Sequence, residues 1–169
     1  MATIMWVFLF PSLFIIHDFE EIIYGHSWFN KNKEIIGAKV PEKLMSRLGD
    51  SLGGSVSQFA FAVLEEFIIL VFLAVLTSIY QWYSFYVCLM FGYCVHAVMH
   101  LFQSIYIRKY IPATGTGIVT SIFIIYGAII IVREQNLQWG FILMGLPLMM
   151  FAIFLNVVFA HWISKRLVK

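Results

Sequence analysis

Two histidines four residues apart, His96 and His100, are the first candidates for chemistry in this sequence. Residues at this spacing lie one above the other on a helix, so both imidazoles can bind one metal ion. His17, Glu20 and Glu21 repeat the arrangement in another segment, because they fall within an arc of about 100° on a helix. The two segments together predict a metal site built from imidazoles and carboxylates.

A third apolar segment adds a pair of carboxylates, Glu65 and Glu66. We expect Glu65 to be a bridging or terminal ligand, and Glu66 to lie outside the ligand shell. The predicted metal ligands are His17, Glu20, Glu21, Glu65, His96 and His100. Gln103 and Asn156 lie on apolar segments and are expected to support the ligands by hydrogen bonds. Asp18, at the edge of the first stripe, is expected to be a supporting or interfacial group.

These ligands leave the identity and the number of the metal ions open. Three histidines, a water molecule and a glutamate base, Glu20 or Glu65, would make a mononuclear zinc site. Mixed imidazole and carboxylate ligands also suit a binuclear iron or manganese site in a helix bundle. The predicted cofactor is therefore one or two divalent ions. A metal-free network of hydrogen bonds that fixes the helix packing is the remaining alternative.

The segments that carry these residues are predicted to cross a membrane. The chain has 169 residues, of which 62% are hydrophobic and only 12% are charged, whereas soluble domains are about 25% charged. About twenty apolar residues in a helix cross the bilayer core. Five such spans are predicted, at 3–25, 58–80, 84–106, 118–132 and 139–162. The predicted fold is all-α, a polytopic membrane helix bundle that forms a single domain over 1–169.

The longest polar stretch, 26–57, is predicted to be a loop, with a possible amphipathic surface helix at 41–48. With five crossings, this loop shares one side of the membrane with 107–117 and the C-terminus. These three regions carry ten basic residues, and only Arg133 lies on the other side. The positive-inside rule then places the N-terminus outside and the C-terminus in the cytoplasm. At 1.5 Å per residue, all the candidate ligands come about 6–15 Å below the cytoplasmic surface, in one layer.

The order of the motifs resembles a known family. The chain resembles the HXXEE family in three motifs: His17-x-x-Glu20-Glu21 in the first apolar helix, a glutamate pair in the second and His96-x-x-x-His100 in the third. These are small multi-helix bacterial membrane proteins named for the first motif. The resemblance covers essentially the whole chain and implies an integral membrane protein with a shared polar site. It implies no particular reaction.

Ionisable groups in the middle of a membrane helix cost about 2.5–3.5 kcal/mol each, so this layer is expected to have a function. We expect a metal-dependent enzyme, a hydrolase or an oxidoreductase, that acts on a membrane lipid or another hydrophobic molecule. The alternative is a divalent-cation or proton-coupled carrier that uses the same layer. The outer halves of the spans lack polar residues that would continue a path, which favours the enzyme. We expect a multi-pass protein of the cell membrane with no nucleic-acid partner, and homo-oligomerisation stays open.

Overall fold

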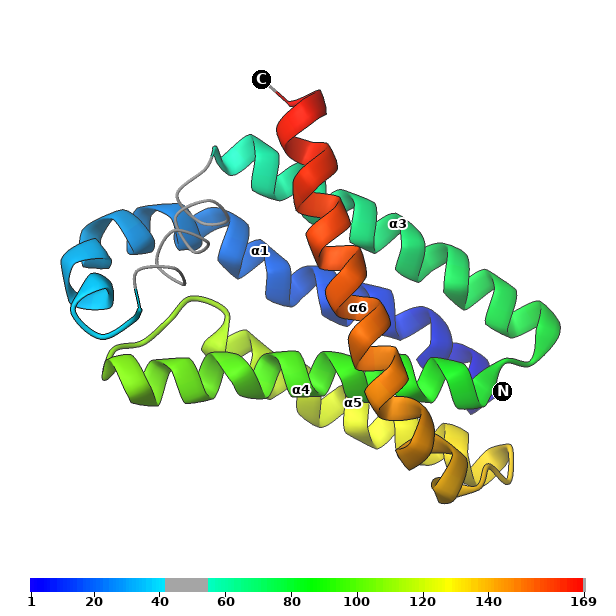
Figure 1. Cartoon of the computed structure of the whole chain (residues 1–169). Coiled ribbons are helices and arrows are strands. Elements are labelled where there is room, and N and C mark those ends of the chain that lie inside the picture. Colours follow the sequence, from blue (N-terminus) through cyan, green and yellow to red (C-terminus); the bar gives the residue numbers. More distant parts are fainter. Residues whose placement is uncertain (42–54, 169) are drawn as a thin grey trace.

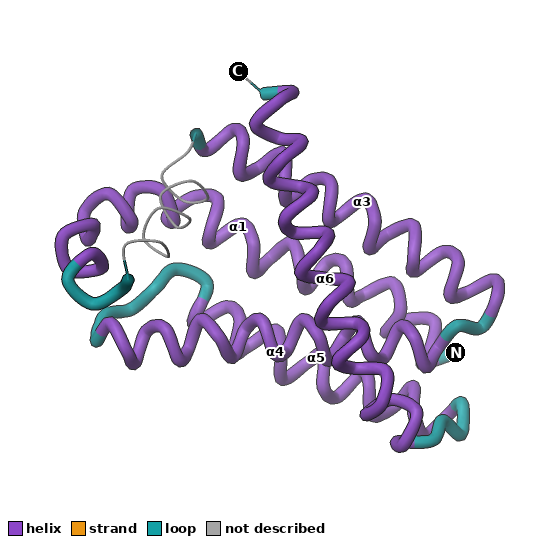
Figure 2. Tube along the Cα trace, viewed as in Figure 1, coloured by secondary structure: helices purple, strands orange, loops and turns teal. Residues whose placement is uncertain are grey.

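The computed structural model describes residues 1–41 and 55–168. Nearly all of these residues lie in five helices, and the described part of the chain contains no strand (Figure 2). The helices are α1 (Ala2–Gly37), α3 (Val56–Tyr80), α4 (Tyr83–Ile107), α5 (Thr114–Glu134) and α6 (Trp139–Leu167) (Figure 1). Each of them is long and apolar enough to cross a membrane. The predicted all-α, multi-pass membrane fold is therefore confirmed.

The first helix is longer than the sequence predicted. The predicted span was 3–25, whereas α1 continues to Gly37. Its last turns keep an apolar face, on which Phe29 and Ile36 are buried against residues at the end of α4. The prediction matched the helix to the thickness of a bilayer and did not consider packing beyond it. The residues 26–37, predicted to belong to the polar loop, are thus helical, and the predicted surface helix at 41–48 lies, but for its first residue, outside the described residues.

The helices form a ring in which each packs mainly against two neighbours. α5 lies between α1 and α4, α6 lies across α3 and α4, and α1 packs along α3. Figure 1 shows that α6 crosses the other helices at a steep angle. Direct contact between α1 and α4 is slight. Side chains that point inward from α1, α3, α4 and α6 therefore face one another across a common space.

The helix ends farthest from the predicted metal layer pack tightly. Gly127 of α5 lies against the ring of Trp6, where an added Cβ atom would come within 2.4 Å of the ring. Tyr86 is fully buried, and its hydroxyl donates a hydrogen bond of 2.8 Å to the carbonyl of Val7. These contacts join α1 to α5 and to α4. The bundle is thus closely packed on the side opposite to the predicted site.

The outer faces of α3 and α6 carry large exposed apolar side chains, such as Phe72 and Phe151. An apolar surface of this extent is unusual on a soluble monomer. In a bilayer the same surface contacts lipid, because the helices satisfy their backbone groups internally and present only side chains. The distribution of exposed residues therefore agrees with the membrane-spanning character of the helices.

Candidate functional site

Three imidazoles meet inside the ring of helices. His96 and His100 lie one turn apart on α4, and His17 faces them from α1. One ring nitrogen of each histidine lies within 4.8 Å of those of the other two. The Nε2 atoms of His96 and His100 are 3.0 Å apart. The ring centroid of His17 is 5.4 Å from that of His100 and 5.6 Å from that of His96. We refer to His17, His96 and His100 as the three-histidine group.

Close packing fixes the position of His17. Its side chain is fully buried, and its ring lies edge-on to Tyr93 with the centroids 5.4 Å apart. Gly117 of α5 lies directly against the imidazole, since an added Cβ atom would be 3.1 Å from Nδ1 of His17. Neither ring nitrogen of His17 makes a well-formed hydrogen bond among the described residues. A buried polar group without a partner costs about 1–3 kcal/mol, and a bound ion would supply the missing partner.

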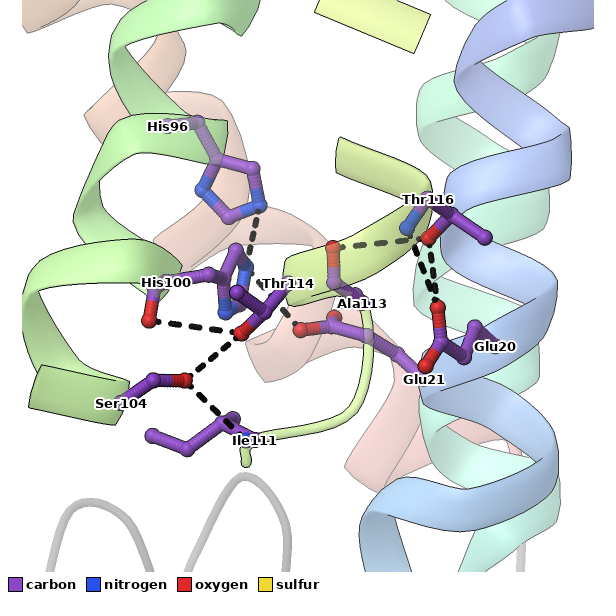
Figure 3. Close-up of polar contacts among 9 residues, drawn as sticks. All are labelled: Glu20, Glu21, His96, His100, Ser104, Ile111, Ala113, Thr114 and Thr116. Carbon is purple, nitrogen blue, oxygen red and sulfur yellow. Dashed lines mark hydrogen bonds and ion pairs between the residues drawn. The ribbon is translucent and has the colours of Figure 1, made fainter. Parts of the chain in front are cut away.

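Carboxylates surround the histidines on the side of α1 and α3. Oε1 of Glu21 lies 3.1 Å from Nε2 of His100 (Figure 3). Asp18 and Glu66 line the same cavity as Glu21. Asp18 is buried, and its Oδ2 has no hydrogen-bond partner in the part of the chain that the structure describes. The site therefore combines imidazole nitrogens with carboxylate oxygens, a donor set that suits borderline and hard divalent ions.

A cavity of about 430 Å³ lies beside the three-histidine group, between α1, α3, α4 and α6. Its polar lining residues are Asp18, Glu21, Glu66, His96, His100, Gln103, Asn156 and His161. Its apolar end is lined by Phe10, Phe14, Leu70, Leu73, Phe85 and Leu89 among others. Small-molecule pockets have volumes of about 300–1,000 Å³, so this cavity is large enough for a substrate. Its lining, drawn from the described residues, includes no lysine or arginine.

The predicted supporting residues lie around the polar end. Asn156 of α6 lines the cavity and donates a hydrogen bond of 3.2 Å from Nδ2 to Oε2 of Glu65. Gln103 and Glu66 line the cavity from α4 and α3. Glu65 itself is not among the lining residues, so the structure places it beside the cavity and outside the three-histidine group. Its part as a ligand stays a prediction.

Glu20 points away from the histidines, toward the start of α5 (Figure 3). Its Oε1 accepts a hydrogen bond of 2.6 Å from the Tyr110 hydroxyl, and its Oε2 accepts one of 2.7 Å from the Thr116 hydroxyl. Partial burial, together with this hydrogen bond to Glu20, raises the pKa of Tyr110. Thr116 is in the first turn of α5, where a carboxylate stabilises the helix end. Glu20 thus has two partners outside the three-histidine group, and its part as a ligand or base also stays a prediction.

Further hydrogen bonds hold the loop before α5 against α4 (Figure 3). The hydroxyl oxygens of Ser104 and Thr114 are 2.7 Å apart, and Oγ of Ser104 accepts a bond of 3.1 Å from the backbone N–H of Ile111. The Thr114 hydroxyl also reaches the carbonyl oxygen of His100, at 3.5 Å. These contacts fix the start of α5 beside the ligand-bearing turn of α4.

Asp18 lines the cavity, whereas the sequence predicted only a supporting or interfacial group at this position. A signal was present, because Phe10, Phe14, Asp18 and Glu21 follow one another at helical spacings of four, four and three and all line the cavity. The interpretation was centred on the stripe through His17 instead. No comparable signal marked the partners of Glu20, since the nearer of them in sequence is 90 residues away.

Comparison with known proteins identifies the family. The model for the family described as proteins of unknown function with an HXXEE motif matches residues 8–131, and the chain belongs to this family. The match covers the site residues on α1, α3 and α4, whereas α6 lies beyond it. No curated protein and no solved structure matches the chain. The family confirms the resemblance seen in the motifs, and the reaction has to be inferred from the site.

Proposed function

We propose that the protein is a membrane-embedded, metal-dependent enzyme that acts on a lipid-like substrate. The observation that carries the proposal is the three-histidine group beside a cavity with one polar and one apolar end. The three histidines would hold a divalent ion of zinc, iron or manganese. The apolar end would take the hydrophobic part of the substrate.

The donor atoms support a metal ion better than a metal-free network. In a network, each buried imidazole needs a hydrogen-bonding partner. His96 and His100 contact each other, and His100 contacts Glu21. His17, in contrast, has no well-formed hydrogen bond at either nitrogen among the described residues, and Nδ1 of His100 is unpaired as well. A metal ion that accepts a lone pair from one ring nitrogen of His17 would remove the deficit at that nitrogen.

A divalent ion in this position would supply Lewis acidity or an activated water molecule at neutral pH. Glu21, 3.1 Å from His100, is placed to hold a proton during the reaction. Asp18 and Glu66 line the polar end and would orient the substrate by hydrogen bonds. The catalytic parts predicted for Glu20 and Glu65 are less favoured by this geometry, because both carboxylates are engaged with side chains outside the histidine group.

The test is elemental analysis of protein purified in detergent without added metal or chelator. We expect at least one equivalent of zinc, iron or manganese, and its loss from a His17→Ala/His96→Ala variant. The matched control is His26→Ala/His161→Ala, which also removes two histidines, one of them a lining residue of the cavity, but none from the three-histidine group. One equivalent of zinc would favour hydrolysis, and two of iron or manganese would favour oxidation at a binuclear site. Absence of metal from the unsubstituted protein after reconstitution would refute the proposal.

We also propose that the polar end of the cavity faces the cytoplasm, with the N-terminus outside and the C-terminus inside. Lys31 and Lys33 lie on the extended α1, and Lys39 lies two residues beyond its end. They are at the same end of the bundle as the end of α4, because Nζ of Lys39 donates a hydrogen bond of 2.8 Å to the carbonyl of Ile107. Both native cysteines are buried. A cysteine introduced as Lys33→Cys should therefore not be labelled by a membrane-impermeant maleimide in intact cells. Labelling of this cysteine would show that the orientation is the reverse of the one proposed.

A further inference from the structure

The cavity changes from polar to apolar along α1 and along α4. On α1 the lining runs from Glu21 and Asp18 to Phe14 and Phe10. Glu21 and Phe10 are eleven positions apart on the helix, which corresponds to about 16 Å at 1.5 Å per residue. The hydrocarbon core of a bilayer is about 30 Å thick, so the cavity as a whole, from its polar end to its apolar end, extends through a depth close to that of one leaflet. This depth suits one aliphatic chain that lies parallel to the neighbouring lipid chains.

α4 and α6 separate on one side of the point where they cross (Figure 1), and residues of both helices line the cavity. The two helices cross closely at Gly92, where an added Cβ atom would lie 2.5 Å from Cδ1 of Ile153. Beyond the crossing, α6 leaves α4 and lies against α3, to which Asn156 is hydrogen-bonded (Figure 1). On the side of α4 that is left uncovered, His96 and Gln103 line the cavity and are exposed. The exposed surfaces of these two side chains face the cavity or the lipid beside it, so an entry at this place would lead from the bilayer to the polar end.

The polar end selects the head of such a molecule by charge. Asp18, Glu21 and Glu66 contribute three carboxyl groups, and the described lining residues include no lysine or arginine. A phosphate or carboxylate head would therefore lie beside three acidic groups with no lysine or arginine to pair with it, and the two charges of the divalent ion proposed above would already have these three carboxyl groups as counter-ions. A hydroxyl or amine head, in contrast, donates hydrogen bonds to carboxyl oxygens, one of which, Oδ2 of Asp18, is buried and unpaired.

We propose that the substrate is a single-chain amphipathic molecule whose head is a hydrogen-bond donor without negative charge, a long-chain alcohol or amine. It enters between α4 and α6, its head lies at Asp18, and its chain lies along Phe14 toward Leu73. This inference rests on the proposed function, because only that function makes the bound molecule a substrate. Binding of the molecule can be measured without any reaction. Lipid chains are as apolar as the cavity, so the chain contributes little free energy of transfer. The head sets the affinity, and the length of the apolar end selects the chain.

The experiment uses the full chain in lipid nanodiscs and probes that carry a photoreactive diazirine at the end of a dodecyl chain. The heads of the three probes are an alcohol, an amine and a carboxylate. We expect saturable labelling of peptides that contain Leu73 or Phe85 by the alcohol or the amine, about tenfold above the carboxylate. Leu73→Trp should fill the apolar end and reduce labelling by the dodecyl probe about tenfold, while an octyl probe still labels. Phe72→Trp is the matched control, because Phe72 is the preceding residue and is exposed to lipid.

Each outcome decides one part of the inference. Equal labelling by the carboxylate probe overturns the assignment of the head. If labelling of the unsubstituted protein does not saturate, or is found on lipid-facing residues alone, the aliphatic chain does not bind in the apolar end. This result does not depend on whether Leu73→Trp folds. The metal content of the same samples is measured separately. Saturable labelling without metal would keep this inference and refute the proposed function, and metal without saturable labelling would do the reverse.

Discussion

The contact between Gly117 and His17 gives a quantitative test of the site. In a Gly117→Ala variant, the added Cβ atom would lie 3.1 Å from Nδ1 and Cε1 of His17 and 3.2 Å from Cβ of Ala97. These distances are shorter than ordinary van der Waals contacts by a few tenths of an ångström. Ala97 is on a helix that cannot move independently, so the imidazole of His17 has to shift. We therefore expect Gly117→Ala to displace a metal ligand without removing it.

The size of the effect follows from the cost of overpacking, about 1–3 kcal/mol for an added methyl group in a packed core. Alanine is favoured over glycine in a helix by about 0.5–1 kcal/mol, which offsets part of this cost in the free energy of unfolding. Distances between a metal and its ligands tolerate only about 0.2 Å. If this cost of about 1–3 kcal/mol destabilises the metal-bound state relative to the metal-free state, metal affinity falls about 5- to 150-fold, because 1.4 kcal/mol corresponds to a factor of ten.

Competition with a chromophoric chelator measures this affinity in detergent, and thermal melting of the same samples reports stability. Gly140→Ala is the matched control, because this helical glycine has nothing within 4 Å of an added Cβ atom. We expect Gly140→Ala to bind metal as tightly as the unsubstituted protein. If Gly117→Ala also binds metal with unchanged affinity, His17 is not a ligand held against α5, and the reasoning about its packing is refuted.

Three further outcomes are expected. Glu20→Ala should lower the free energy of unfolding by about 1–3 kcal/mol, since the hydroxyl of Thr116 loses its charged acceptor; its metal content should stay unchanged, and loss of metal would restore the ligand role. Burial and the bond to Glu20 raise the pKa of Tyr110, so its stabilisation is present below the ordinary tyrosine pKa and is lost as the pH rises through the raised value; melting of Tyr110→Phe across alkaline pH should lack this loss. Gly127→Ala places a Cβ atom 2.4 Å from the ring of Trp6 and should destabilise the protein by about 1–3 kcal/mol, which an unchanged melting temperature would contradict.

The five crossings could be predicted because hydropathy depends only on local composition. The end of α1 could not be fixed in this way, since bilayer thickness limits the apolar span and says nothing about turns beyond it. In the structure those turns are stabilised by tertiary packing, in which Phe29 and Ile36 are buried. Their spacing of seven was a usable signal, because it places both side chains on one helix face.

The separation of Glu20 from Glu21 shows what spacing could not decide. The two carboxylates are adjacent and lie about 100° apart on the helix, so both were compatible with the stripe through His17. The structure sends Glu21 toward His100 and Glu20 toward Thr116. Which neighbour each one meets depends on the position of α5, a helix without ionisable groups in the predicted span. The sequence of such a helix does not indicate that it positions the carboxylates of α1. Its glycines nevertheless determine how closely α1 packs against α5.

The packing beyond the polar layer also bears on the choice between an enzyme and a carrier. A carrier has to continue a polar path from the histidines to the opposite face of the membrane. On α4 the cavity lining beyond His96 consists of Tyr93, Gly92, Leu89 and Phe85. The hydroxyl of Tyr93 is already hydrogen-bonded to Thr120 at 2.6 Å and is not free to coordinate an ion. An ion that left the histidines in this direction would lose its ligands without replacement, at a large desolvation cost. A polar layer that ends in an apolar cavity therefore favours retention of a metal ion and binding of a hydrophobic substrate over transit of the ion.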